Sequence, residues 1–128
     1  ELKSLLVSQG RSFIFTTGVP EACARAALKA LSLANDERRE RLFDRIKRFR
    51  EGLLNQGIPA LGKHHIVPIV LGSRTMSVAG QLREAGFLVP GIRPPTVAEG
   101  QERLRVTLSA AHSEEQIDRL LDQLGRIL

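Results

Sequence analysis

The clearest pattern along the chain is an alternation of apolar and polar residues between positions 103 and 109. This period of two predicts a strand whose side chains point to opposite faces in turn. The apolar face consists of Leu104, Val106 and Leu108, which we expect to pack against helices. The polar face consists of Arg103, Arg105 and Thr107. The two arginines lie about 6–7 Å apart along the strand, since each residue advances about 3.3 Å.

Two long amphipathic helices are predicted from apolar residues spaced three and four positions apart. The first runs from about Asp36 to Asn55, and its apolar stripe is Leu42, Ile46, Phe49 and Leu53. We interpret the basic residues off this stripe as a solvated face without function: Arg38, Arg39, Arg45, Lys47, Arg48 and Arg50. The last helix follows Ser113, which forms a capping-box pattern with Gln116. Its predicted buried face is Ile117, Leu120, Leu121, Leu124 and Ile127.

Shorter elements fill the rest of the chain. We expect a helix end at Leu2 to Val7, stopped by Gly10, and a short buried strand at Phe13 to Phe15. Pro20 is suited to start a helix. The helix that follows Pro20 has a face of mostly small residues, which predicts close packing on a neighbouring helix: Cys23, Ala26, Ala27, Ala30 and Leu31.

The segment from His65 to Leu71 is predicted to be a strand, and Pro68 within it indicates an edge or a bulge. Ser73 is expected to cap a helix that ends at Gly86, and Phe87 to Val89 to form another short strand. The order from Ile66 onward is therefore strand, helix, strand, strand, helix. This order predicts an α+β fold, an α/β two-layer sandwich with a small sheet backed by helices.

Composition narrows the class of protein. The length of 128 residues is typical of one domain, and 42% hydrophobic with 26% charged residues is ordinary for a globular protein. The net charge of +5 favours nucleic-acid binding at first sight. However, acidic residues alternate with the basic ones, and five Phe without Trp or Tyr offer little for base stacking. We therefore expect no nucleic-acid partner.

The single cysteine, Cys23, excludes an internal disulfide and a cysteine metal cluster, and it is typical of a reducing compartment. We expect a cytoplasmic protein and no metal. No run approaches the roughly 20 apolar residues that span a membrane, so no membrane contact is expected.

Two candidate anion sites follow from the residues. Arginine presents a planar fork of donors that matches a carboxylate or phosphate, and Arg93, Arg103 and Arg105 lie near the stiff Pro94-Pro95 turn. Thr16 and Thr17 precede a helix start, where free N–H groups favour anions. The local pattern by itself favours the ordinary alternatives, which are solvated arginines on an uncovered sheet face and a threonine turn with a helix cap.

Other catalytic patterns are not evident. Ser109 and His112 lie three residues apart, but no acidic residue is placed to orient them. His64 and His65 are interpreted as structural. The residues by themselves suggest a small anionic ligand, as for a free-standing α+β module that binds a carboxylate.

The segment GIRPPTVAEGQERLRVTLSAAHSEEQIDRLL resembles the C-terminal signature of the α-oxoamine synthases, fold-type I enzymes that use pyridoxal 5'-phosphate (PLP). RSFIFTTGVPEACARAAL is similar to the strand and turn that lead into the small domain of that family, and GFLVP before IRPPTV fits as well. The resemblance covers essentially the whole chain. It implies that residues 1–18 end the large PLP domain with a connecting strand and turn, and that residues 19–128 form the C-terminal small α/β domain.

The resemblance implies a homodimeric acyltransferase with PLP as cofactor. It condenses an amino acid, here L-alanine, with a pimeloyl thioester of CoA or a carrier protein and releases CO2. Carried over by motif, Arg105 would bind the carboxylate of the amino acid, and Arg93 the acyl chain or its carboxylate. Thr16 and Thr17 would reach the PLP phosphate of the neighbouring subunit. Arg103 is interpreted as structural, and His112 receives no role.

Two departures from the family pattern matter. The Schiff-base lysine of the family lies in a Ser/Thr-x-x-Lys-Ala motif, and Lys3, Lys29, Lys47 and Lys63 all stand in other contexts. We therefore expect a missing large cofactor domain, a chain that is about the C-terminal third of the enzyme, and no catalysis by this part alone. Ala98 stands where the family usually has proline, which removes no functional group. An α-oxoamine synthase with other substrates, of the 2-amino-3-ketobutyrate ligase type, stays an alternative to the enzyme that condenses alanine with a pimeloyl thioester.

Overall fold

The computed structural model describes residues 1–10 and 18–128, which form two units by their internal contacts, Glu1–Ala34 and Asn35–Leu128. The first unit holds helices α1 (Leu2–Gln9) and α2 (Glu21–Leu33), with Pro20 as the cap of α2. The helix before Gly10 is confirmed. The close packing expected for the small residues of α2 is not seen, because every residue of that helix is exposed. The strand expected at Phe13 to Phe15 lies outside the described residues, and the predicted boundary after residue 18 stays a prediction.

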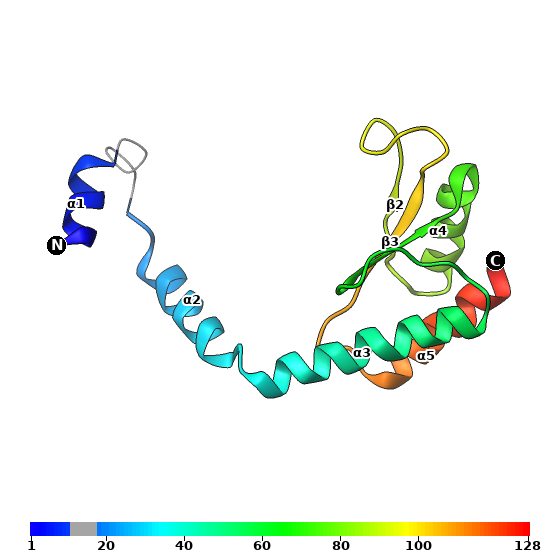
Figure 1. Cartoon of the computed structure of the whole chain (residues 1–128), viewed down its shortest axis with the longest axis horizontal. Helices are drawn as coiled ribbons and strands as arrows, with labels where there is room; N and C mark the ends of the chain where they lie inside the picture. Colours follow the sequence, from blue (N-terminus) through cyan, green and yellow to red (C-terminus); the bar gives the residue numbers. More distant parts are fainter. Residues whose placement is uncertain (11–17) are drawn as a thin grey trace. The chain divides into compact units, whose positions relative to one another are not determined.

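The second unit is a two-layer arrangement of one sheet and three helices (Figure 1). In chain order its elements are α3 (Asp36–Asn55), β1 (Ile66–Val70), the 3₁₀ turn η1 (Gly72–Arg74), α4 (Thr75–Glu84), β2 (Gly91–Ile92), β3 (Arg103–Thr107) and α5 (Glu114–Ile127). The strands are antiparallel in the order β1-β3-β2. The predicted order of strand, helix, strand, strand, helix is confirmed.

Strand β3 lies at the centre of the sheet and shows the predicted alternation. Leu104, Val106 and Leu108 are buried, whereas Arg105 and Thr107 are exposed. Pro68 on β1 pairs with Arg105. β1 is an edge strand, as Pro68 predicted, because the nitrogen without a hydrogen costs no ladder bond at an edge.

The strand expected at Phe87 to Val89 is wrong. The ladder between β2 and β3 covers only Gly91–Ile92, and its last bond runs from the N–H of Arg105 to the carbonyl oxygen of Pro90 at 2.9 Å. Pro90 has no N–H to return a second bond, so the pairing ends there and the preceding residues leave the sheet.

Ser73 does not cap α4, which corrects a second expectation. It lies inside η1, and α4 begins one residue after Arg74 without a side-chain cap. The N–H groups of Leu71 and Gly72 both donate to the carbonyl oxygen of Glu102, at 3.0 and 3.1 Å, and this tethers the chain where the 3₁₀ turn starts. Gly86 ends the helix segment as predicted, with a φ of 88° that favours glycine.

The core lies between the inner sheet face and the three helices. The α3 stripe is confirmed, with Ile46, Phe49 and Leu53 buried and Leu42 partly buried. On α5, Ile117, Leu120, Leu121 and Leu124 are buried and Ile127 is partly buried, and the Ser113–Gln116 capping box is present. The sheet contributes Val67, Ile69, Leu104 and Val106 from its inner face.

Gly52 permits the close approach of α3 and α5. A Cβ atom at this position would lie 2.9 Å from Cδ2 and 3.1 Å from Cγ of buried Leu121. We expect Gly52→Ala to destabilise the chain by about 1–3 kcal/mol, because Leu121 must leave its rotamer. Gly80→Ala on α4 meets no atom within 4 Å, so the same exchange should stabilise by about 0.5–1 kcal/mol. Urea unfolding of the two variants measures both values, and a loss of equal size in both would contradict the packing argument.

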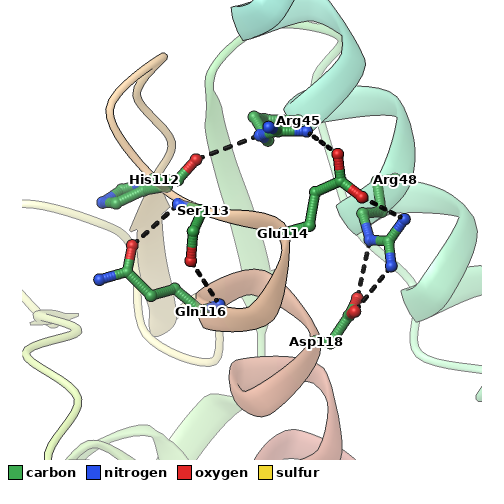
Figure 2. Close-up of polar contacts among 7 residues, drawn as sticks. All are labelled: Arg45, Arg48, His112, Ser113, Glu114, Gln116 and Asp118. Atoms are coloured by element: carbon green, nitrogen blue, oxygen red, sulfur yellow. Dashed lines mark hydrogen bonds and ion pairs between the residues drawn. The ribbon is translucent and has the colours of Figure 1, made fainter.

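Part of the basic face of α3 is not merely solvated, which corrects the interpretation of Arg45 and Arg48. Figure 2 shows both side chains directed at the start of α5. Arg45, only 15% exposed, donates to Glu114 at 2.7 Å and to the carbonyl oxygen of His112 at 3.1 Å. Arg48 forms two bonds to Asp118, at 2.8 and 2.6 Å, and lies 3.2 Å from Glu114. These contacts join α3 to α5 at the edge of the core.

The bidentate bond from Arg48 lowers the pKa of Asp118 below its ordinary value. The folded chain therefore binds this proton less readily than the unfolded chain does. The resulting stability is present above the unfolded pKa of about 3.9 and is lost as the pH falls through the folded value. We expect the difference in melting temperature between wild type and Asp118→Asn to be larger at about pH 6 than at about pH 3. The control is Asp122→Asn, which removes an exposed carboxylate from the same helix and is measured at the same two pH values.

Candidate functional site

The outer face of the sheet carries two of the predicted arginines, Arg103 and Arg105. Arg105 is exposed at the centre of β3 and pairs with Pro68 of β1. Within the described residues its side chain forms no hydrogen bond and no ion pair. A guanidinium that is free to bind and is carried on the central strand of a sheet is well placed for bidentate recognition of a carboxylate.

Arg103 differs from Arg105 although both lie on the same face. Its Nε donates to the carbonyl oxygen of Gln101 at 2.8 Å, and its Nη2 lies 3.4 Å from the Gln101 side-chain oxygen. Much of its fork of donors is thus occupied by its own loop. These contacts support a structural role for Arg103.

Arg93 directly follows Ile92, the last residue of β2, which pairs with Arg103 on β3. Arg93 is exposed, and its carbonyl oxygen accepts from the N–H of Thr96 at 3.1 Å in a loop with a cis Pro94-Pro95 bond. Arg93 thus lies in the loop after β2, beside the sheet that carries Arg105. Thr16 and Thr17 lie outside the described residues.

A cavity of about 420 Å³ extends along β3 beyond the end of its pairing with β2. Its wall includes Arg105, Thr107, Phe87, Pro90, His112 and Arg119. The guanidinium carbon Cζ of Arg119 lies over the ring of Phe87, 5.9 Å from the ring centre. The cavity wall contains basic residues and no carboxylate, which favours an anionic occupant. Sequence reasoning missed Arg119 and gave His112 no role, because only the docking of α5 beside β3 brings them to this cavity.

No group of histidine, cysteine and acidic side chains is arranged to hold a metal ion in 1–10 and 18–128. In the same part of the chain, no helix combines the length and the apolar character that crossing a membrane requires. Cys23 is exposed and has a free thiol.

Comparison with known proteins adds the family. The model of the aminotransferase class I and II family matches residues 1–124. The chain belongs to this family. An 8-amino-7-oxononanoate synthase of Pseudomonas entomophila (strain L48) is 48% identical over an alignment of 130 positions, which covers 98% of this chain and 33% of that protein.

Solved structures agree on the fold. The serine palmitoyltransferase of Sphingomonas wittichii matches with a TM-score of 0.85 and 27% identity over 97% of this chain and 33% of its own. The 8-amino-7-oxononanoate synthase of Francisella tularensis matches with a TM-score of 0.77 and 25% identity over 98% and 38%. The predicted α+β small domain of a fold-type I PLP-dependent transferase is thus confirmed. This chain spans about a third of the length of the curated relatives it matches.

In residues 1–10 and 18–128, the lysine that a PLP Schiff base needs does not lie beside Arg105. Lys3, Lys29, Lys47 and Lys63 are all exposed, and none is placed in a cavity wall beside Arg105. Of the three described phenylalanines, Phe49 is buried in the core, Phe87 lies under Arg119, and Phe43 is exposed on α3, away from the sheet arginines. The donors that are free on the sheet suit a substrate carboxylate, not the ring or Schiff base of the cofactor.

Proposed function

We propose that this chain is the C-terminal part of a PLP-dependent 8-amino-7-oxononanoate synthase, an enzyme of biotin synthesis. The reaction joins L-alanine to a pimeloyl thioester and releases CO2 and the free thiol of CoA or of a carrier protein. The observation that carries the proposal is the free guanidinium of Arg105 on the central strand, in a chain 48% identical to such a synthase. When bound, PLP supplies the electron sink for the new carbon–carbon bond.

Arg105 has the task of binding and orienting the amino acid. Two parallel N–H···O bonds to its carboxylate hold the substrate in one orientation, which a single point charge cannot do. β3 is hydrogen-bonded to both neighbouring strands up to Arg105, so the sheet holds the backbone on the N-terminal side of this residue. Orientation of this kind lowers the entropic cost of the condensation step.

The remaining assignments follow the same proposal. Arg93 would contact the acyl chain or its carboxylate from the loop after β2, where its side chain is exposed. Thr16 and Thr17 would contact the PLP phosphate of the neighbouring subunit in a homodimer. Most PLP contacts and the Schiff-base lysine would come from a large domain outside this chain. We place the protein in the cytoplasm, without a membrane or nucleic-acid partner.

A substrate panel on the full-length protein tests the proposal. Alanine with pimeloyl-CoA or pimeloyl-carrier protein should give CO2, free thiol and 8-amino-7-oxononanoate. Glycine with acetyl-CoA and serine with palmitoyl-CoA serve as the competing pairs within the same fold. A clear preference for either competing pair would refute the biotin assignment. The absence of PLP absorbance in the purified protein would refute the enzyme class.

A further inference from the structure

The C-terminal end of β3 is held on one side only. Arg105 makes the last bond to the β2 side, through its N–H to Pro90, and Pro90 returns no bond. Beyond Arg105, the described residues hold the strand from the β1 side, where the N–H of Leu108 donates to the carbonyl oxygen of His65 at 2.8 Å. The position of Arg105 therefore depends on how firmly the next few residues are fixed.

A turn from Ser109 to His112 fixes this end, and the imidazole of His112 closes it. The backbone N–H of Ser109 donates to Nδ1 of His112 at 3.1 Å, and the N–H of His112 donates back to the carbonyl oxygen of Ser109 at 3.1 Å. The N–H of Ala111 adds a bond to the Ser109 hydroxyl at 3.2 Å. Each polar group of the turn named here has a partner inside the turn.

The same residue also ties the turn to the helices. The carbonyl oxygen of His112 accepts from Nε of Arg45 at 3.1 Å, and Ser113 begins the capping box of α5 (Figure 2). Arg45 is itself held by Glu114. His112 is thus the point where β3, α3 and α5 meet, and it lies in the wall of the cavity that also contains Arg105.

We propose that His112 is a positioning residue for Arg105, which it keeps in place by accepting the N–H of Ser109 at the end of β3. This inference rests on the proposed function, since it takes Arg105 as the group that binds the amino-acid carboxylate. His112 acts through the backbone and need not touch the substrate. Its Nδ1 acceptor is the atom that matters.

Two substitutions in the full-length enzyme separate this role from a general loss of stability. His112→Leu fills similar space without an acceptor, whereas the side-chain oxygen of His112→Asn can stand where Nδ1 does. We expect His112→Leu to raise the KM for alanine about tenfold, the worth of one hydrogen bond, with kcat and the KM for the pimeloyl thioester changed less than about twofold. His112→Asn should restore the KM for alanine to within about twofold of wild type.

His64→Leu is the matched control, because His64 is exposed and its side chain makes no hydrogen bond within the described residues. A merely structural His112 would lower the melting temperature and the active fraction while the KM for alanine stays constant. A constant KM for alanine in His112→Leu would overturn the inference, and so would a His112→Asn variant as impaired as His112→Leu. The proposed function would stand in both cases, provided that the wild-type enzyme makes product. A wild-type enzyme that does not use alanine overturns the proposed function instead, and the same KM comparison then runs with the amino acid it does use.

Discussion

Replacing Arg105 with lysine in the full-length enzyme is expected to weaken binding of the amino-acid substrate about ten- to hundredfold. Lysine keeps the positive charge but offers one ammonium point in place of two parallel donors, so the bidentate bond is lost. A charge-assisted hydrogen bond contributes about 1.5–3 kcal/mol, which sets this range. The KM for alanine and the spectral titration of the bound cofactor with alanine both measure the change. The content of PLP per subunit should stay near that of wild type, because the proposed function gives Arg105 a contact with the amino acid and none with the cofactor.

Arg103→Lys is the control for this experiment. Arg103 lies two residues away on the same face of β3, but its guanidinium bonds to Gln101. Its replacement should leave the KM for alanine within about twofold, since no bond to the substrate is lost. If both lysine variants raise the KM equally, the effect comes from the charge of the sheet face and not from a specific carboxylate contact. An unchanged KM in Arg105→Lys would remove Arg105 from the substrate site.

Elements defined by a local pattern were predictable from the sequence. The alternation at Leu104 and Val106, the stripe at Ile46 and Phe49, and the Ser113 cap each report burial or capping within one element. Such signals need no knowledge of the partner element, because a half-buried strand or helix shows its buried face in its own periodicity. Pro68 likewise indicated an edge or a bulge from the missing N–H alone, and the structure has it on an edge strand.

Features that depend on two elements were not predictable in the same way. Arg45 and Arg48 resembled other helix-face charges until the docking of α5 placed Glu114 and Asp118 against them. The short extent of β2 follows from Pro90 meeting Arg105, a register that no local pattern reports. The helix that Ser73 was expected to cap begins later in the chain. The carbonyl oxygen of Glu102, far away in the sequence, accepts the N–H groups of Leu71 and Gly72 just before it.

The candidate site divides along the same line. Alternation placed Arg103 and Arg105 on one face but could not distinguish a guanidinium bound to its own loop from a free one. The contact between Arg103 and Gln101 supplies that distinction. His112 had no visible role in the sequence, since its Nδ1 contact to Ser109 depends on the conformation of the turn and not on residue spacing alone.

Phe49→Ala is expected to cause the largest loss of stability, about 3–5 kcal/mol in the free energy of unfolding of this chain. Phe49 is fully buried, with 0% exposure, on the α3 face that packs against the sheet and α5. Truncation removes the free energy gained by burying the ring and leaves a cavity. The cavity cannot close fully, because Ile46 and Leu53 on the same helix are also packed in the core. Urea unfolding followed by circular dichroism measures the loss.

Phe43→Ala is the matched control, because it makes the same exchange on the same helix at a side chain that is 57% exposed. Both variants gain the same helix propensity from alanine, so the difference between them isolates burial. We expect Phe43→Ala to change the free energy of unfolding by less than about 0.5 kcal/mol. Equal losses in the two variants would show that α3 does not pack through the stripe of Ile46, Phe49 and Leu53. The support that this helix gives to α5, and through Arg45 to the end of β3, would then have to come from the polar contacts alone.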